Sequence, residues 1–170
     1  MKIKKLTWLV LSGLIINSSL LGNISLHAKQ AQLSAQSDFL FMQYRQFFRE
    51  SPKSKKGLDA LFAMGEYYFL MSDFDHANEC FQLFLKDGKS KSKKLFTYAY
   101  LVRISEIKGN KKQSKELSKE LMLYQKNIFI FNDSKQYKFQ SPFKRRHKIV
   151  YSIDKVEFFV EGKSFEKITL

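Results

Sequence analysis

The chain has 170 residues, of which 44% are hydrophobic, and 17 residues are phenylalanine. This length and composition support one domain with a real hydrophobic core, and they exclude disorder throughout the chain. The formal net charge of +14 makes the chain strongly basic and points to an acidic partner or surface.

The N-terminus has the features of an export signal. Three of the first five residues are lysine, the segment Leu6–Leu21 is uncharged and mostly apolar, and Ala28 offers a small residue for cleavage. We therefore predict that residues 1–28 are a signal peptide and that the protein is exported, periplasmic or envelope-associated. An uncleaved anchor is the alternative, although the apolar run is shorter than the roughly 20 residues that span a bilayer. No cysteine lies near the end of this run, so we do not expect a lipoprotein.

Helical periodicity begins after a polar lead-in over residues 29–37. Beyond it, apolar residues recur at three- and four-residue spacing. Pro52, Asp73, Gly88 and Gly109 mark where helices begin or end, since proline breaks a helix, aspartate caps its start and glycine suits its end. The predicted helices cover residues 38–51, 55–71, 74–86, 92–108 and 111–124.

One stretch carries the spacing of a known helical repeat. It has a large residue, an apolar–glycine pair, a tyrosine, and an alanine followed by a phenylalanine one turn later, at Leu61, Met64, Gly65, Tyr68, Ala77 and Phe81. This stretch resembles the tetratricopeptide superfamily. The longer segment Phe47–Leu121 is similar to its exported bacterial branch, which includes the Tol–Pal-associated periplasmic protein and the outer-membrane assembly lipoprotein. The resemblance implies stacked helical hairpins whose concave face binds a protein partner, and it implies no catalytic residue.

The last segment, residues 127–170, changes to strand-like alternation. Aliphatic and aromatic residues alternate with polar ones, and Glu161–Gly162 is typical of a hairpin turn. We predict three or four short strands, with a helix over residues 149–160 as the alternative. So small a sheet is not stable alone, and we expect it to pack as a cap on the last helix pair. The predicted fold is therefore mainly α, a short tetratricopeptide-like α-solenoid over residues 38–126 with a small C-terminal β segment.

No residue pattern indicates catalysis. The sequence has no phosphate-binding glycine loop and no serine-hydrolase or zinc-protease motif. Asp73, His76 and Cys80 share helical spacing, but a closed zinc site needs four ligands, so we predict a helix cap and a buried thiol there. We expect no enzyme activity, no metal and no cofactor.

Basic residues are concentrated in four clusters. Three of them, Lys53–Lys56, Lys89–Lys94 and Lys111–Lys112, fall at joints between predicted helices, and such joints can lie on one edge of a stacked array. We predict that the clusters attract an acidic partner, and the alternative is that they are solvated linkers and helix ends. The fourth and densest cluster contains Lys144, Arg145, Arg146 and Lys148, with His147 among them.

Two functions follow as hypotheses. The first is a non-enzymatic exported adaptor that binds a protein partner in the cell envelope through the concave helix face, where we expect Tyr67 to lie. The alternative is a basic module that binds anionic lipid or an acidic wall polymer. Export disfavours nucleic acid as a partner. Self-association is a further expectation, because a solenoid of two or three repeats has few units with which to build its core.

Overall fold

The computed structural model describes residues 36–129, 136–141, 143–152 and 155–169. The predicted signal peptide and nearly all of the predicted lead-in lie outside these residues. The chain divides after Phe39, and the features below belong to the compact unit Leu40–Leu170. In the part of the chain that is described, no helix combines the length and the apolar character needed to cross a membrane.

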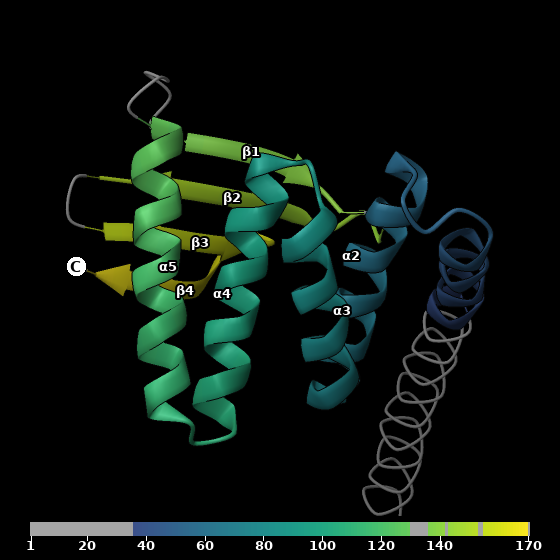
Figure 1. Ribbon diagram of the computed structural model, residues 1–170, viewed down its shortest axis with the longest axis horizontal. Helices are drawn as coiled ribbons and strands as arrows, with labels where there is room; N and C mark the ends of the chain where they lie inside the picture. The colour runs from purple at the N-terminus through teal and green to yellow at the C-terminus, as the bar shows by residue number, and fades with distance from the viewer. Residues whose placement is uncertain (1–35, 130–135, 142, 153–154, 170) are drawn as a thin grey trace, which may run out of the picture. The chain divides into compact units, whose positions relative to one another are not determined.

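Beyond a helix that ends at residue 50, the described chain forms two antiparallel helical hairpins that lie side by side (Figure 1). The first consists of α2 (Lys55–Leu70) and α3 (Phe74–Asp87), and the second of α4 (Lys91–Ile107) and α5 (Lys111–Phe129). Four side chains cap these helices by accepting a hydrogen bond from the backbone N–H three residues further on, at Ser54, Asp73, Ser90 and Asn110. The predicted helices are present, and α5 continues to Phe129, beyond the helix end expected at residue 124.

The C-terminal segment forms an antiparallel sheet, in which the described strands follow the order β1-β2-β3-β4. Their bounds are β1 Gln136–Gln140, β2 Arg146–Tyr151, β3 Lys155–Val160 and β4 Lys163–Thr169. The predicted turn at Glu161–Gly162 joins β3 to β4, with φ angles of 52° and 76°. The strand prediction is confirmed. The helical alternative over residues 149–160 is wrong, because the described side chains of β3 alternate between a buried and a more exposed face.

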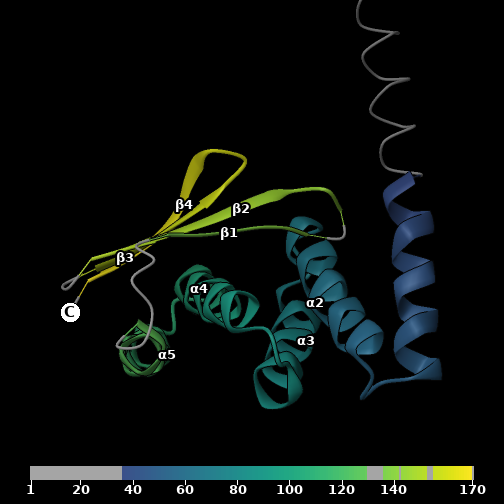
Figure 2. The same cartoon turned by 90° about the horizontal axis from the view of Figure 1, so that it is seen from above.

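The inner face of the sheet packs against α2 and α4, as Figure 2 shows from above. Phe62 of α2 meets Phe139 of β1 with ring centroids 6.0 Å apart, and Phe96 of α4 meets Phe158 of β3 at 5.2 Å. Phe158 has no exposed surface. We had expected a cap on the last helix pair. The sheet instead spans both hairpins, because both α2 and α4 present aromatic side chains on the same face and one sheet buries them together.

Candidate binding surfaces

The residues of the repeat signature form the contact between α2 and α3. Ala77 and Phe81 have no exposed surface, and a Cβ atom at Gly65 would lie 2.6 Å from Cε1 of Phe81. The Phe81 ring in turn stacks on Tyr100 of α4 with centroids 4.7 Å apart. Gly65 therefore permits the close packing of α2 against Phe81 of α3. Leu61 and Met64 are buried beside them, whereas Tyr68 is half-buried and stacks on His76.

The face of α2 and α4 that was expected to form an open groove is covered by the protein's own sheet. Tyr67, the residue expected to line that groove, is half-buried. Its ring stacks on Phe41 at 4.2 Å and on Phe143 at 6.2 Å. Aromatic neighbours from the first helix and from the β1–β2 turn thus pack against Tyr67, and its role in partner binding stays a prediction.

A buried polar cluster, which was not predicted from the sequence, joins the sheet to the helices. The side chains of Glu66 (α2) and His147 (β2) have no exposed surface, and Nε2 of His147 lies 2.9 Å from Oε1 of Glu66. The hydroxyl of Tyr100 (α4) donates a hydrogen bond of 3.0 Å to the same oxygen. Burial, followed by the negative charge of Glu66, raises the pKa of Tyr100 well above its ordinary range. Three elements far apart in the sequence thus meet at one carboxylate.

His147 is also held from its other side. Its Nδ1 lies 3.1 Å from the carbonyl oxygen of Arg145, and its ring stacks on Phe139 with centroids 4.7 Å apart. The second oxygen of Glu66, Oε2, has no hydrogen-bond partner in the described structure. This arrangement fixes the position of the sheet on the helices, because moving His147 away would leave the buried Glu66 carboxylate without one of its hydrogen-bond partners.

The densest basic cluster does not form one patch. Its residues alternate between the two faces of β2, so His147 enters the core while its neighbours point outward. Arg146 is exposed and pairs with Glu161 at 3.1 Å, and the Nζ atom of Lys148 lies 4.6 Å from the centre of the Phe159 ring on the outer face of the sheet. Lys144 is exposed on the β1–β2 turn, and Arg145 is half-buried.

Two of the other clusters meet at one end of the helical array. α3 runs antiparallel to α2 and α4, so the first turns of α2 and α4 lie at the same end (Figure 1). An ion pair of 2.6 Å between Lys93 of α4 and Asp59 of α2 ties these turns together. The β1–β2 turn reaches the same end, where Ser141 lines a cavity with Lys55 and Lys56. We call this surface the basic end, and it contains Lys53, Lys55, Lys56, Lys89, Lys91, Lys94 and Lys144.

Two neighbouring cavities open at the basic end. One has a volume of about 520 Å³ and is lined by Lys55, Lys89 and Phe84 among others, and the second, of about 630 Å³, shares Lys55 with it. The second cavity also contains Phe47, whose ring lies 3.5 Å from the Nζ atom of Lys56. Both cavities combine cationic and aromatic side chains with the Asp59 carboxylate, which pairs with Lys93.

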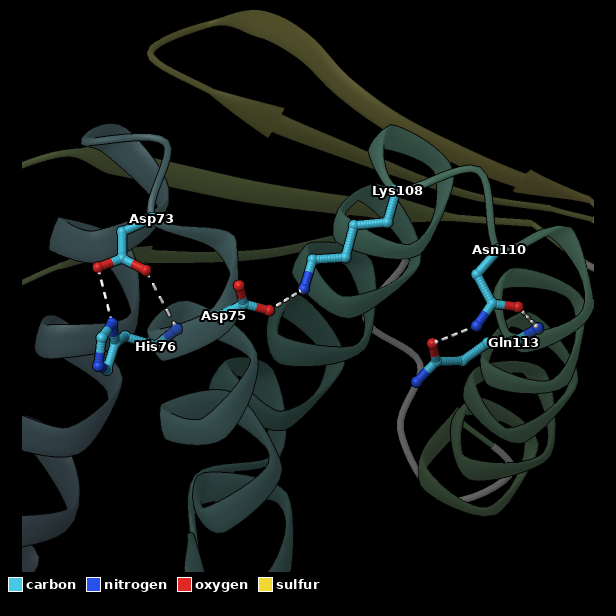
Figure 3. Close-up of polar contacts among 6 residues, drawn as sticks. All are labelled: Asp73, Asp75, His76, Lys108, Asn110 and Gln113. Carbon is cyan, nitrogen blue, oxygen red and sulfur yellow. Dashed lines mark hydrogen bonds and ion pairs between the residues drawn. The ribbon is translucent and has the colours of Figure 1, made fainter.

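The opposite end of the array carries paired charges (Figure 3). Asp73 caps α3, and its Oδ2 atom lies 2.7 Å from Nδ1 of His76. Lys108 of α4 forms an ion pair with Asp75 of α3. Lys111–Lys112 lies at this end too, at the joint between α4 and α5 (Figure 1), because consecutive joints in a row of antiparallel helices alternate between the two ends. The three joint clusters therefore do not form one stripe.

The helical spacing of Asp73, His76 and Cys80 does not produce a metal site among the described residues. Among the described residues there is no group of three or more His, Cys, Asp or Glu side chains arranged to hold a metal ion. Cys80, the third member of the pattern, is buried, and burial raises the pKa of its thiol to about 12. A thiol in this state is a poor ligand and a poor nucleophile at neutral pH.

Comparison with protein-family models, with curated proteins and with solved structures finds no match to this chain. The architecture is that of a helical repeat followed by a small sheet. The relation to the tetratricopeptide superfamily stays a prediction, which rests on the signature residues alone.

Proposed function

We propose that this protein is a non-enzymatic binding module that docks on an anionic bilayer surface through its basic end. The observation that carries the proposal is the gathering of three basic segments, far apart in the sequence, at one end of the helical array. This end is formed by the starts of α2 and α4 and by the β1–β2 turn.

The charges of the basic end are free to act on a partner. Among the described residues, none of the seven lysines that define it forms an ion pair with a carboxylate. Lys93, which pairs with Asp59, is not one of the seven. Each lysine close to an anionic bilayer contributes about 1 kcal/mol to binding. A cluster of this size therefore supports reversible attachment at low ionic strength, with little need for apolar insertion.

The sheet on α2 and α4 favours this function over a protein partner in the concave groove. A peptide in that groove would have to displace the rings of Phe139 and Phe158 and break the buried contact between Glu66 and His147. The predicted export signal is consistent with a membrane nearby, and so we propose an envelope location.

Vesicle co-sedimentation tests the proposal. The full chain should sediment with phosphatidylglycerol vesicles and not with phosphatidylcholine vesicles. Binding should fall steeply as the ionic strength rises to 0.15 M and beyond, where the Debye length is about 8 Å. A triple variant with Lys53→Gln, Lys55→Gln and Lys89→Gln, called the end variant, should lose most of this binding.

A matched control keeps the same net charge. It carries Lys111→Gln, Lys112→Gln and Lys167→Gln, three exposed lysines outside the basic end, and should bind as the wild type does. Equal losses in the two variants would show that net charge alone drives binding and would overturn the proposal. Retention on a glycerol-phosphate wall polymer without retention on vesicles would assign the basic end to the polymer instead.

A further inference from the structure

A groove on α5, the last helix of the array, is separate from the basic end. It has a volume of about 480 Å³ and lies between α5 and the end of β4. Its apolar part includes Met122 and Leu123, and Thr169 closes it on the β4 side. Leu123 is 63% exposed, whereas Met122 beside it is buried.

The opposite side of α5 is the one that faces the protein. Leu117 and Leu121 are buried, and Tyr124 contacts Tyr98 of α4 with ring centroids 5.9 Å apart. In a row of stacked hairpins, the next helix would cover the outer side of the last one. Among the described residues no helix does so, and Leu123 is left open to solvent.

The charges along the groove have one sign. Lys115, Lys119 and Lys126 line it, at positions that span about 16 Å or three turns of helix. None of them forms an ion pair in the described structure. On α5, the negative charge of Glu120 adds to burial in raising the pKa of Tyr98 of α4, whereas Glu116 is exposed.

We infer that this groove binds an acidic amphipathic helix of a partner protein. The apolar stripe of the incoming helix would cover Leu123, and its carboxylates would meet the three lysines. A second copy of the chain is the less favourable occupant, because its own net charge of +14 brings like charges together. The inference does not rest on the proposed function, because the two surfaces belong to different helices and bind different classes of partner.

A peptide-binding measurement with the full chain tests the inference. The probe is a fluorescent peptide of about 18 residues, with leucines at helical three- and four-residue spacing and glutamates between them. Anisotropy should show binding of this peptide and none of a second peptide in which every glutamate is lysine. Replacing Lys115, Lys119 and Lys126 with Gln, called the α5 variant, should weaken binding by about tenfold, since three partly exposed ion pairs are lost.

Two variants separate this site from general attraction. The end variant has the same net charge as the α5 variant and should keep wild-type affinity for the peptide. Leu123→Ser changes no charge and should also weaken binding, because it removes the apolar contact. Thermal melting of each variant checks that its fold is retained.

Three outcomes would overturn the inference. The first is equal binding of the acidic and basic peptides, and the second is equal affinity in the α5 and end variants. The third is a dimer, seen by light scattering, that Leu123→Ser dissociates, which would make a second copy the occupant.

Discussion

Glu66 and His147 connect a helix to a strand at a place that water does not reach. Removing the imidazole leaves the Glu66 carboxylate buried, with the Tyr100 hydroxyl as its remaining partner among the described residues. We therefore predict that His147→Ala lowers the free energy of unfolding by about 3–5 kcal/mol, as breaking one side of a buried pair does. Urea denaturation measures this change.

The adjacent residue provides the control. Arg146 pairs with Glu161 on the exposed surface of the same sheet, so Arg146→Ala should change the stability by less than about 1 kcal/mol. Similar losses for both variants would mean that His147 contributes no more than an exposed side chain does, and the buried contact would lose its assigned role.

Gly65 leaves room for the Phe81 ring, and this ring cannot retreat because it stacks on Tyr100. We predict that Gly65→Ala destabilises the protein by about 1–3 kcal/mol through overpacking, partly offset by about 1 kcal/mol of helix propensity. In a Phe81→Leu background the same substitution should be less harmful, since the smaller side chain relieves the clash. A double-mutant cycle in urea gives the coupling, and a coupling of zero would contradict this explanation of the glycine.

Cys80 gives a pH-dependent expectation. Burial raises the pKa of its thiol from 9.0 to about 12. A raised folded-state pKa means that this group's contribution to stability is fully present below pH 9 and is lost as the pH rises from 9 towards 12. Native protein at pH 8 should therefore react slowly with iodoacetamide, and urea should speed the reaction. Fast labelling without urea would show that the thiol is not buried.

At the scale of elements, much of the fold follows from local patterns. Capping residues such as Asp73 and turn pairs such as Glu161–Gly162 act on their immediate neighbours, so the sequence predicts where elements start and end. The position of the sheet depends on contacts between distant residues, such as Phe62 and Phe139, and no local pattern encodes it. α5 shows a smaller failure, since it continues to Phe129 through residue types that favour strands.

The buried cluster was missed although one signal was present. His147 has the same parity along the strand as Ile149, which is buried, so period-two alternation alone places it on the inner face. Its position among Lys144, Arg145, Arg146 and Lys148 made it look like part of a surface cluster. For His147, strand alternation predicts the side chain's burial correctly, and the density of neighbouring charges does not.

Adjacent residues on β3 test the packing of the sheet. Phe158 is fully buried against Phe96 of α4, whereas Phe159 lies half-buried on the outer face. We predict that Phe158→Ala costs about 3–5 kcal/mol of stability and Phe159→Ala about 1 kcal/mol or less. Urea denaturation of both variants provides the measurement. Equal losses would mean that the sheet does not rest on the helices by this face.

At the scale of the whole molecule, antiparallel packing decides which basic clusters meet. Consecutive helix joints alternate between the two ends, so Lys53–Lys56 and Lys89–Lys94 share one end while Lys111–Lys112 lies at the other. The same packing leaves α5 at the edge of the row with its lysine-lined groove exposed. Two basic surfaces result. The basic end gathers lysines from several segments of the chain, and the groove on α5 combines three lysines with the exposed Leu123.

If these surfaces are independent, the protein should join an anionic vesicle to an acidic peptide helix. We predict that phosphatidylglycerol vesicles sediment the acidic peptide only when the wild-type protein is present. The end variant should leave the peptide bound to protein in the supernatant, and the α5 variant should sediment without the peptide. Vesicles that displace the peptide from the wild type would instead mean that both ligands use one surface, and the assignment of the groove on α5 to a helix would then fail because a bilayer occupies it.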